Sequence, residues 1–249
     1  MVGHSKWAKV KHFKGAIDAK RGKIFSKLSK EISIAAKLGG ADPGMNPRLR
    51  MVLLKCRAAN MPNDNIDRAI KKGIGGGETA NFEDLTYEIY GPHGVAVLVE
   101  VSTDNRNRTA SEIRSIVTKN GGTIASQGSV SRLFHRKGQI IVSRDAANED
   151  QLMEVALDAG AEDFKAEPEG YEIVTNPAHF EAVHKQIEAK GIKPAAAEVT
   201  ALASVTVPLA AEPAATAVNR LLEALEDHDD VKEVYSNAEF SEDAVKGQG

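Results

Sequence analysis

The sequence predicts a multi-domain α+β protein: an N-terminal three-helix domain followed by two α+β domains, the last ferredoxin-like and inserted in the other. Three observations predict this class. The chain has 249 residues, more than one compact domain usually needs. Residues 1–78 carry 17 Lys and Arg against 6 Asp and Glu, whereas residues 79–249 carry 15 against 29. The second half also shows a strand-helix-strand-strand-helix-strand order.

The first thirty residues form a strongly basic arm, with eight Lys and Arg21 against a single Asp. Lysines spaced two or three apart can follow a phosphate backbone and release its condensed counterions. Trp7 and Phe13 lie among these lysines, and unpaired bases stack on such rings. We favour nucleic-acid contact over two alternatives, a solvated arm without a ligand and an arm that binds an anionic membrane surface.

Three helices are expected in the basic head, residues 1–78. Apolar residues recur at helical spacing over Lys20–Leu38, and its lysines form a separate stripe. A second helix begins at Asn46-Pro47, where Asn caps and Pro takes the first position. The third follows the turn at Asn60–Asn63 and runs through Lys72. Its first turn carries carboxylates, which argues against a DNA-recognition helix.

Two other features of the head have structural interpretations. Cys56 lies on the apolar stripe of the second helix, so we expect a core residue and not a nucleophile. The glycine-rich run Gly73–Gly77 follows a helix and lacks the Gly-Lys-Ser/Thr ending of a phosphate-binding loop. It is therefore interpreted as a helix end and a hinge between domains.

The next domain is expected to be assembled from two halves. Two strands flank Gly91–Gly94, and a helix runs from Arg106 to Lys119. Near the end of the chain, another helix over Glu212–Asp227 lies between short strands. Neither half can bury a core alone, so we expect them to form one domain.

The inserted domain is predicted from its alternating elements. The order βαββαβ is that of the ferredoxin-like fold, which some RNA-binding domains share, but their aromatic-rich strand motif is absent. The expected strands and helices are Gln139–Ser143, Asn148–Ala159, Asp163–Ala166, Tyr171–Thr175, Pro177–Lys190 and Ala197–Thr200. The predicted boundaries are 1–78 for the head, 79–133 with 201–240 for the split domain, 134–200 for the insert and 241–249 for a disordered tail.

No catalytic constellation is evident, and we expect no catalytic residue, metal site or cofactor. HExxH, GxSxG and CxxC are absent from the sequence. His228 lies among acids but in a turn, which favours an exposed turn over a metal site. Arg106 and Arg108 could bind an anion, although pairing with neighbouring acids is favoured.

The expected compartment is the cytoplasm. One cysteine excludes an internal disulfide, and no run of eighteen apolar residues could span a membrane. The basic start lacks the apolar region of a secretory signal.

Four long and unusual stretches follow one another along the chain: GHSKWAKVKHFKGAIDAKRGKIFSKLSKEI, NPRLRMVLLKCRAANMPNDNIDRAIKKG, YEIYGPHGVAVLVEVSTDNRNRTASEIRSIVTKNGG and GSVSRLFHRKG. They closely resemble the YebC family, which includes bacterial YebC/PmpR proteins and the mitochondrial translational activator of cytochrome oxidase subunit I. Phe13 stands where the resemblance leads us to expect a basic residue, and His93 where Gly is commoner.

The resemblance implies three domains, one inserted in another, and two candidate functions. One is a ribosome-associated translation factor that eases synthesis of proline-rich stretches, and the other is a transcriptional regulator that binds promoter DNA. We favour the first, with rRNA as target and basic ribosomal proteins as further partners of the acidic domains, and expect no small-molecule substrate. The predicted nucleic-acid-binding residues are Lys6, Trp7, Lys9, Lys11, His12, Lys14, Lys20, Arg21, Lys23 and Lys27.

Overall fold

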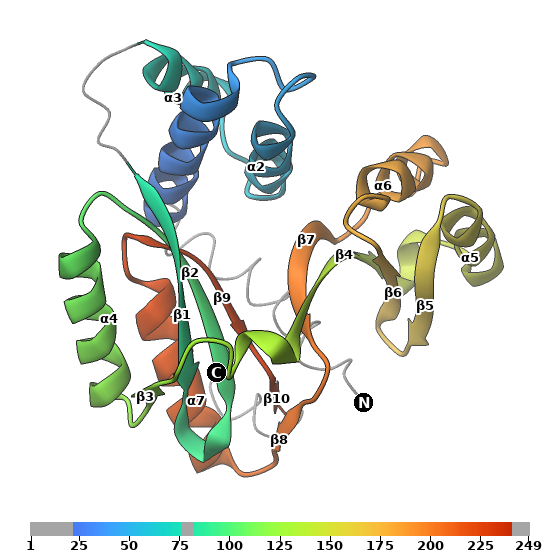
Figure 1. Ribbon diagram of the computed structural model, residues 1–249. Coiled ribbons are helices and arrows are strands. Elements are labelled where there is room, and N and C mark those ends of the chain that lie inside the picture. Colours follow the sequence, from blue (N-terminus) through green and yellow to red (C-terminus); the bar gives the residue numbers. More distant parts are fainter. Residues whose placement is uncertain (1–21, 76–81, 241–249) are drawn as a thin grey trace. The chain divides into compact units, whose positions relative to one another are not determined.

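A computed structural model describes residues 22–75 and 82–240 (Figure 1). These residues form two compact units, each built from separate stretches of chain. One unit contains residues 82–135 and 201–240, and the other contains residues 22–75 and 136–200. The fold class is α+β, as predicted: a helical N-terminal region precedes two α+β domains, one inserted in the other.

Three helices make up the described part of the head. The first covers residues 22–39, and α2 (Pro47–Ala58) and α3 (Asn63–Ile74) follow it. The predicted start of α2 is confirmed, because the Asn46 side chain accepts a hydrogen bond from the Leu49 N–H and Pro47 follows at the first position. The buried core joins the three helices through residues such as Ile32, Leu49 and Ala69.

The first helix and α3 approach each other closely at Gly73. A Cβ atom on Gly73 would lie 2.4 Å from the Ser33 carbonyl oxygen and 2.9 Å from the Ala36 Cβ. The Ser33 hydroxyl also donates a hydrogen bond of 2.8 Å to the Ala69 carbonyl. The first glycine of the predicted hinge is therefore a helix-packing residue inside α3, which extends two residues beyond the predicted Lys72.

The other unit contains a four-stranded sheet in the order β3-β1-β2-β9, with β1 and β2 forming the predicted hairpin. Helices α4 and α7 pack on one face of the sheet. Strands β8 and β10 pair in parallel and form a separate two-stranded sheet. The elements are β1 (Glu83–Tyr90), β2 (Ala96–Thr103), α4 (Arg106–Lys119), β3 (Thr123–Ile124), β8 (Val207–Leu209), α7 (Glu212–Glu226), β9 (Val231–Ser236) and β10 (Ala238–Phe240).

Strand β2 is buried on both faces, which explains its nearly continuous apolar sequence. Val97, Val99 and Val101 belong to the cluster shared with α4 and α7. Ala96 and Leu98 lie on the opposite face of the strand. They belong to a second cluster, which includes residues of the segments that precede and follow the insert. Both halves of the split domain therefore contribute to its two cores.

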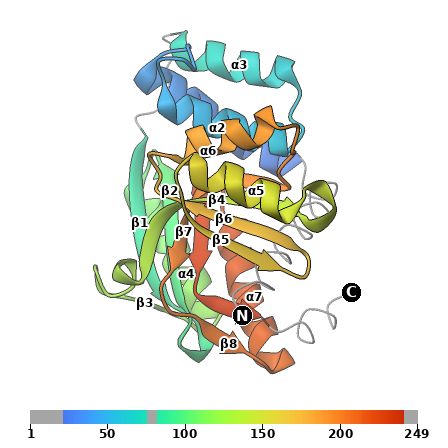
Figure 2. The same ribbon diagram turned by 90° about the vertical axis from the view of Figure 1, so that its right-hand side faces the viewer.

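The inserted part has the ferredoxin-like topology. Its sheet order is β5-β6-β4-β7, with β4 and β5 each antiparallel to β6, and α5 and α6 pack together on one face (Figure 2). The elements are β4 (Phe134–Ser143), α5 (Glu149–Asp158), β5 (Ala161–Glu167), β6 (Gly170–Thr175), α6 (Phe180–Ala189) and β7 (Ala196–Ala203), with a 3-10 turn at Arg144–Ala146. Two further 3-10 turns, at Pro92–Gly94 and Ser131–Leu133, belong to the split domain.

Three predicted element bounds are wrong by three residues or more. Strand β7 ends at Ala203 and not at Thr200. Helix α6 begins at Phe180 and not at Pro177, because the Asn176 side chain accepts from the Ala178 N–H and holds a turn ahead of the helix. Strand β4 begins at Phe134 and not at Gln139, although its first residues are polar. The domain boundaries stay a prediction, and the proposed tail lies outside the described residues. Among the helices described, none is long and apolar enough to cross a membrane.

Candidate nucleic-acid interface

Most of the predicted contact residues lie outside the described residues. The structure describes two of the ten, Lys23 and Lys27, on the helix that covers residues 22–39. Lys23 is exposed and Lys27 half-buried, and both take part in further contacts. The eight predicted residues outside the described ranges are Lys6, Trp7, Lys9, Lys11, His12, Lys14, Lys20 and Arg21.

The first helix separates a cationic side from a core side. At 3.6 residues per turn, Lys23, Lys27, Lys30 and Lys37 fall within about 80° of one another around the axis. Leu28 and Ile32 lie on the buried side. The apolar spacing and the lysine stripe therefore describe two faces of one helix, as the sequence predicts.

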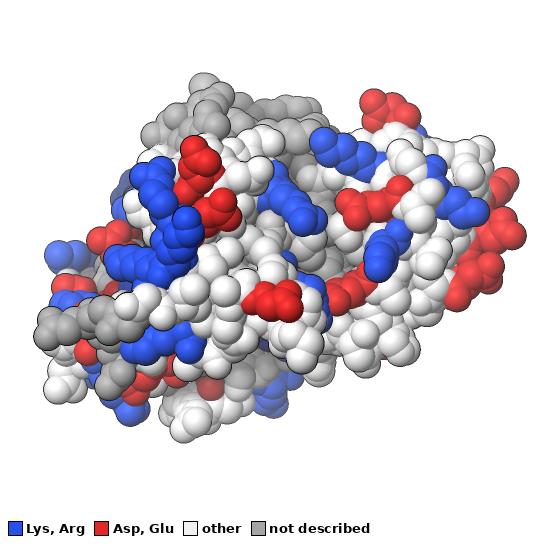
Figure 3. Space-filling view, turned by 90° about the horizontal axis from the view of Figure 1, so that it is seen from above, with Lys and Arg blue, Asp and Glu red and all other residues white. Residues whose placement is uncertain are grey.

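The described head is positively charged overall. Residues 22–75 carry eleven Lys and Arg and four Asp and Glu. Cationic side chains gather over the helices of the head in the space-filling view (Figure 3). A surface with this excess of positive charge attracts phosphate at long range and contributes to binding through counterion release.

Three cations that the sequence analysis did not select have the exposure expected of phosphate contacts. Arg57 near the end of α2, and Lys71 and Lys72 near the end of α3, are exposed. Among the residues that the structure describes, none of the three forms an ion pair. Their positions in the last turns of two helices are the sequence signal for this exposure.

Helix α3 does not present a DNA-reading surface at its start. Asp64 lies in its first turn, and α3 has no side-chain cap. Arg68 donates from Nε to the Asp64 carbonyl at 3.1 Å, and from Nη2 to the Asn65 side chain. The Arg68 guanidinium is thus hydrogen-bonded to the first turn of α3, where Asp64 lies. A carboxylate where bases would be read supports the prediction that α2 and α3 are not a helix-turn-helix reader.

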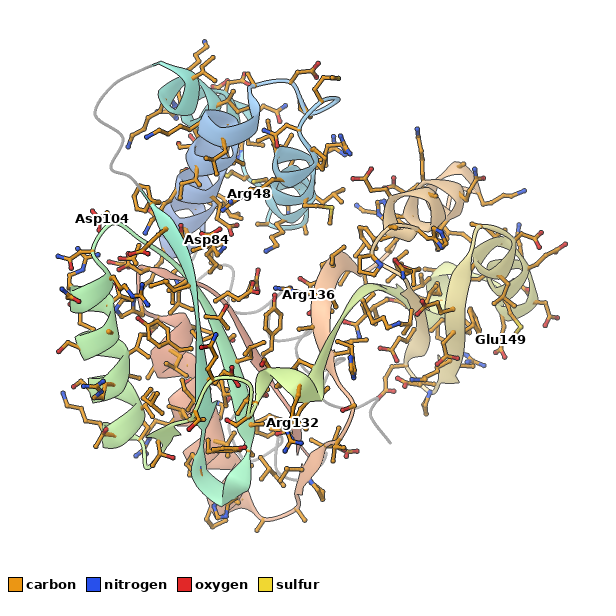
Figure 4. All side chains as sticks on the ribbon, in the orientation of Figure 1. Arg48, Asp84, Asp104, Arg132, Arg136 and Glu149 are labelled. Carbon is orange, nitrogen blue, oxygen red and sulfur yellow. The ribbon has the colours of Figure 1, made fainter. Side chains whose placement is uncertain are left out.

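The arginine near the start of α4 is paired with acids. Arg108 Nη2 lies 2.9 Å from Asp104 Oδ1 and 2.7 Å from the buried Asp230 Oδ2, which also accepts from the Thr109 hydroxyl at 2.7 Å (Figure 4 labels Asp104). The hydrogen bonds to Asp230 and Asp104 raise the pKa of Arg108. Pairing with acids, the favoured interpretation, is confirmed for Arg108.

The turn around His228 differs from the expectation. His228 Nδ1 accepts from the Asp230 N–H at 3.1 Å, and Nε2 lies 2.8 Å from Glu112 Oε2. The His228 side chain is only 10 % exposed, so an exposed turn is the wrong description of this residue and of Asp230. The ring bridges the loop to α4. Within residues 22–75 and 82–240, no group of three His, Cys, Asp or Glu could hold a metal ion.

Cys56 belongs to the core of the head, as predicted. Its side chain is fully buried. Burial, followed by the negative charge of Glu31, raises the pKa of the Cys56 thiol to about 11. Because the thiolate is the nucleophile, this environment is unsuited to covalent catalysis.

A buried carboxylate missed by the sequence analysis organises a loop of the split domain. Glu88 on β1 accepts hydrogen bonds from the backbone N–H groups of Gly128, Val130 and Ser131, at 2.6, 2.6 and 2.8 Å. Burial raises the pKa of Glu88, but these donors outweigh it and hold the pKa below its ordinary value. All donors belong to the protein itself, so this site is structural.

Comparison with known proteins covers both halves of the chain. Residues 5–76 match the domain described as "TACO1/YebC protein N-terminal domain", and residues 82–238 match "TACO1/YebC second and third domain".

Full-length relatives and a solved structure agree with these matches. A "Probable transcriptional regulatory protein" of Acidobacterium capsulatum is 52 % identical over 97 % of this chain and 98 % of its own. One of Trichlorobacter lovleyi with the same name is 52 % identical over 99 % of both chains. The crystal structure of a conserved hypothetical protein of Aquifex aeolicus is 46 % identical, covers 91 % of this chain and 93 % of its own, and has a TM-score of 0.78.

Proposed function

Because the chain belongs to the TACO1/YebC family, we propose that it is a non-enzymatic, nucleic-acid-binding regulator of gene expression whose contact surface is the helical head. The observation that carries the proposal is the charge of the head: eleven cations against four acids in residues 22–75 alone, in a chain whose net charge is −3. The acidic remainder repels phosphate, so the binding surface belongs on the head.

The favoured target is ribosomal RNA, in a cytoplasmic translation factor that eases synthesis of proline-rich stretches. The lysines of the arm and of the first helix, with Arg21, would contact phosphates, while Trp7 and His12 would contact bases or riboses. The protein would act by position, holding rRNA or tRNA in a productive geometry without a cofactor. Its acidic domains would orient it against basic ribosomal proteins. The start of α3 supports this choice, because its carboxylate is unfavourable next to DNA bases.

The alternative is a transcriptional regulator that binds promoter DNA through the same arm. Two relatives that bear the name "Probable transcriptional regulatory protein" favour it. Counterion release depends on phosphates and not on the kind of nucleic acid, so the cationic surface is compatible with either target.

Cosedimentation with ribosomes tests the favoured target. We expect the intact chain to sediment with ribosomes, and the triple change of Lys9, Lys11 and Lys14 to Glu to abolish this. The matched control changes Lys185, Lys190 and Lys193 to Glu, which alters the charge equally on an exposed part of the insert. Equal loss in both variants would mean that only net charge matters and would contradict a binding surface on the head.

Footprinting separates the two targets. A footprint at one promoter that resists competitor DNA, without ribosome binding, would replace the favoured target with the alternative. Ribosome profiling of a deletion strain should show pauses at runs of proline codons if the translation function is correct. A truncated chain beginning at Phe82 that binds as tightly as the intact chain at the same salt would refute the head as the binding surface.

A further inference from the structure

The loop between the first helix and α2 is held by hydrogen bonds from two side chains, Asn46 and Arg50. The Asn46 amide donates to the carbonyls of Ala35 and Gly40, both at 2.8 Å. Arg50 Nη1 donates to the carbonyls of Pro43 and Gly44, at 2.8 and 3.0 Å. A buried Asn and a guanidinium thus fix the loop backbone from both sides, and its conformation is ordered before any partner binds.

Two turn contacts complete this loop. The Gly44 N–H donates to Asp42 Oδ1 at 2.8 Å, and the Met45 N–H donates to the Asp42 carbonyl at 3.1 Å. Gly40, at the end of the first helix, has a φ of 85°, which glycine adopts without strain. The chain therefore reverses direction immediately after the helix, and residues 42–45 form a compact turn.

This ordered loop exposes apolar side chains. Met45 is 81 % exposed and Leu38, at the end of the first helix, is 70 % exposed; both values exceed those of the other exposed large apolar residues in the described chain. We call Leu38 and Met45 the apolar tip. Apolar side chains on an ordered backbone can be buried by a partner without the entropy cost of first ordering the loop.

Cations outnumber acids around the apolar tip. Lys37 precedes Leu38, and Arg48 follows Met45 by three residues, whereas Asp42 lies in the same turn as Met45. Arg50, which also bonds this loop, forms an ion pair of 3.0 Å with Glu181. Leu38 falls about 60° around the first helix from Lys23, on the side of the lysine stripe, and about 22 Å farther along the axis. Leu38 therefore lies at the far end of the lysine stripe of the first helix.

We propose that the apolar tip contacts unstacked bases of the nucleic acid that the lysine stripe holds by its phosphates. This inference rests on the proposed function of the head. Charge complementarity selects nucleic acid as the partner, because the residues 22–75 around the tip carry a net positive charge. Met and Leu are among the side chains that proteins insert between bases, and a preorganised loop lowers the entropy cost of doing so. The lysine stripe contacts the phosphates of the nucleic-acid strand, and the apolar tip contacts bases at the end of this stripe.

Binding of a single-stranded 20-nucleotide RNA that contains 2-aminopurine tests the proposal. With the full chain we expect fluorescence to rise on binding, since unstacking relieves quenching. Met45→Ser should lower affinity by about tenfold, the scale of losing one large apolar contact, and reduce the fluorescence change. The dependence of log K on log salt should stay unchanged, because no phosphate contact is lost. Leu38→Ser should also lower the affinity for RNA. Met45→Leu keeps a large apolar side chain at this position and should bind RNA like the intact chain.

Val205→Ser is the matched control, since Val205 is an apolar residue 60 % exposed in the other compact unit. It should bind RNA like the intact chain, and all variants should keep the melting temperature. If the intact chain binds and Met45→Ser binds equally well, the inference is wrong while the proposed function stands. If the intact chain binds no RNA, DNA or ribosome, the proposed function itself fails.

Discussion

Glu88 shows how a single residue fixes a loop. Its carboxylate accepts from the backbone N–H groups of Gly128, Val130 and Ser131, while the Arg132 guanidinium donates to the Ser129 carbonyl of the same segment. Hydrogen bonds to a buried charge contribute more to stability than those between neutral groups, because the charged form would otherwise be desolvated without compensation.

We predict that Glu88→Gln lowers the free energy of unfolding by about 2 kcal/mol, the scale of a hydrogen bond to a charged group. The folded-state pKa of Glu88 lies below the ordinary value of 4.5, so its contribution is complete above that pH and is lost as pH falls through the folded-state pKa. Urea unfolding at several pH values should therefore show the gap between intact and variant chains narrowing in acid. A gap of constant size from neutral to pH 3 would contradict this account.

The burial of Cys56 predicts that its thiol reacts slowly in the folded chain. Because its buried thiol has a pKa raised to about 11, almost no thiolate exists at neutral pH. Iodoacetamide should label the native chain very slowly at pH 7.5, and in urea the rate should rise to that of an ordinary thiol. Mass spectrometry at fixed times measures this. Rapid labelling of the native chain would show that the core of the head opens readily.

At the scale of elements, the head depends on one close helix crossing. The backbone of the first helix and that of α3 meet where Gly73 has no side chain, and Ser33 donates across the same contact. The crossing holds the basic first helix in place, so its geometry bears on the proposed binding surface.

Gly73→Ala should destabilise the head by about 2 kcal/mol, because the added Cβ meets backbone that cannot move aside like a flexible side chain. Gly22→Ala is the control, since a Cβ there meets nothing within 4 Å. It should be neutral or slightly stabilising, as alanine favours helix more than glycine does. Thermal unfolding followed by circular dichroism distinguishes them. An equal melting temperature for both variants would mean that the crossing is looser than described.

At the scale of the whole molecule, the split domain carries its own cores. Every member of its two apolar clusters comes from residues 82–135 or 201–240. The Ser204 N–H donates to the Leu133 carbonyl at 2.8 Å, so the two strands that lead into the insert lie side by side where they leave the domain. The insert is therefore attached through adjacent ends, which is the arrangement that domain insertion requires.

Replacing residues 136–200 by a short Gly-Ser linker should leave the split domain folded. We expect a single cooperative urea transition and slow hydrogen exchange in β2, whose faces are both covered within this domain. Exchange measured by mass spectrometry reports this directly. Loss of protection throughout β2 would show that the insert is part of the folding unit, and the predicted boundaries would then need revision.

Sequence alone determined the helical head, the ferredoxin-like order and the split domain, because each depends on local periodicity or on counting whether a piece can bury a core. The family resemblance, and not the sequence by itself, indicated that Gly is commoner than His at position 93. The φ of 59° at His93 gives the physical reason, since left-handed backbone favours glycine. Two element starts were missed where a side-chain turn at Asn176 or pairing of polar residues in β4 outweighed local preference.

The candidate site was predictable only in part. The charge of the head follows from composition, and Lys23 and Lys27 from helical spacing. The loop that presents Met45, the Glu88 carboxylate and the Arg108–Asp230 pair were decided by tertiary structure. These contacts join residues 6 to 122 positions apart, and no local pattern encodes which backbone groups will meet a given side chain. Sequence specified which elements form and how they are charged, whereas folding decided which side chains are buried, paired or left exposed for a partner.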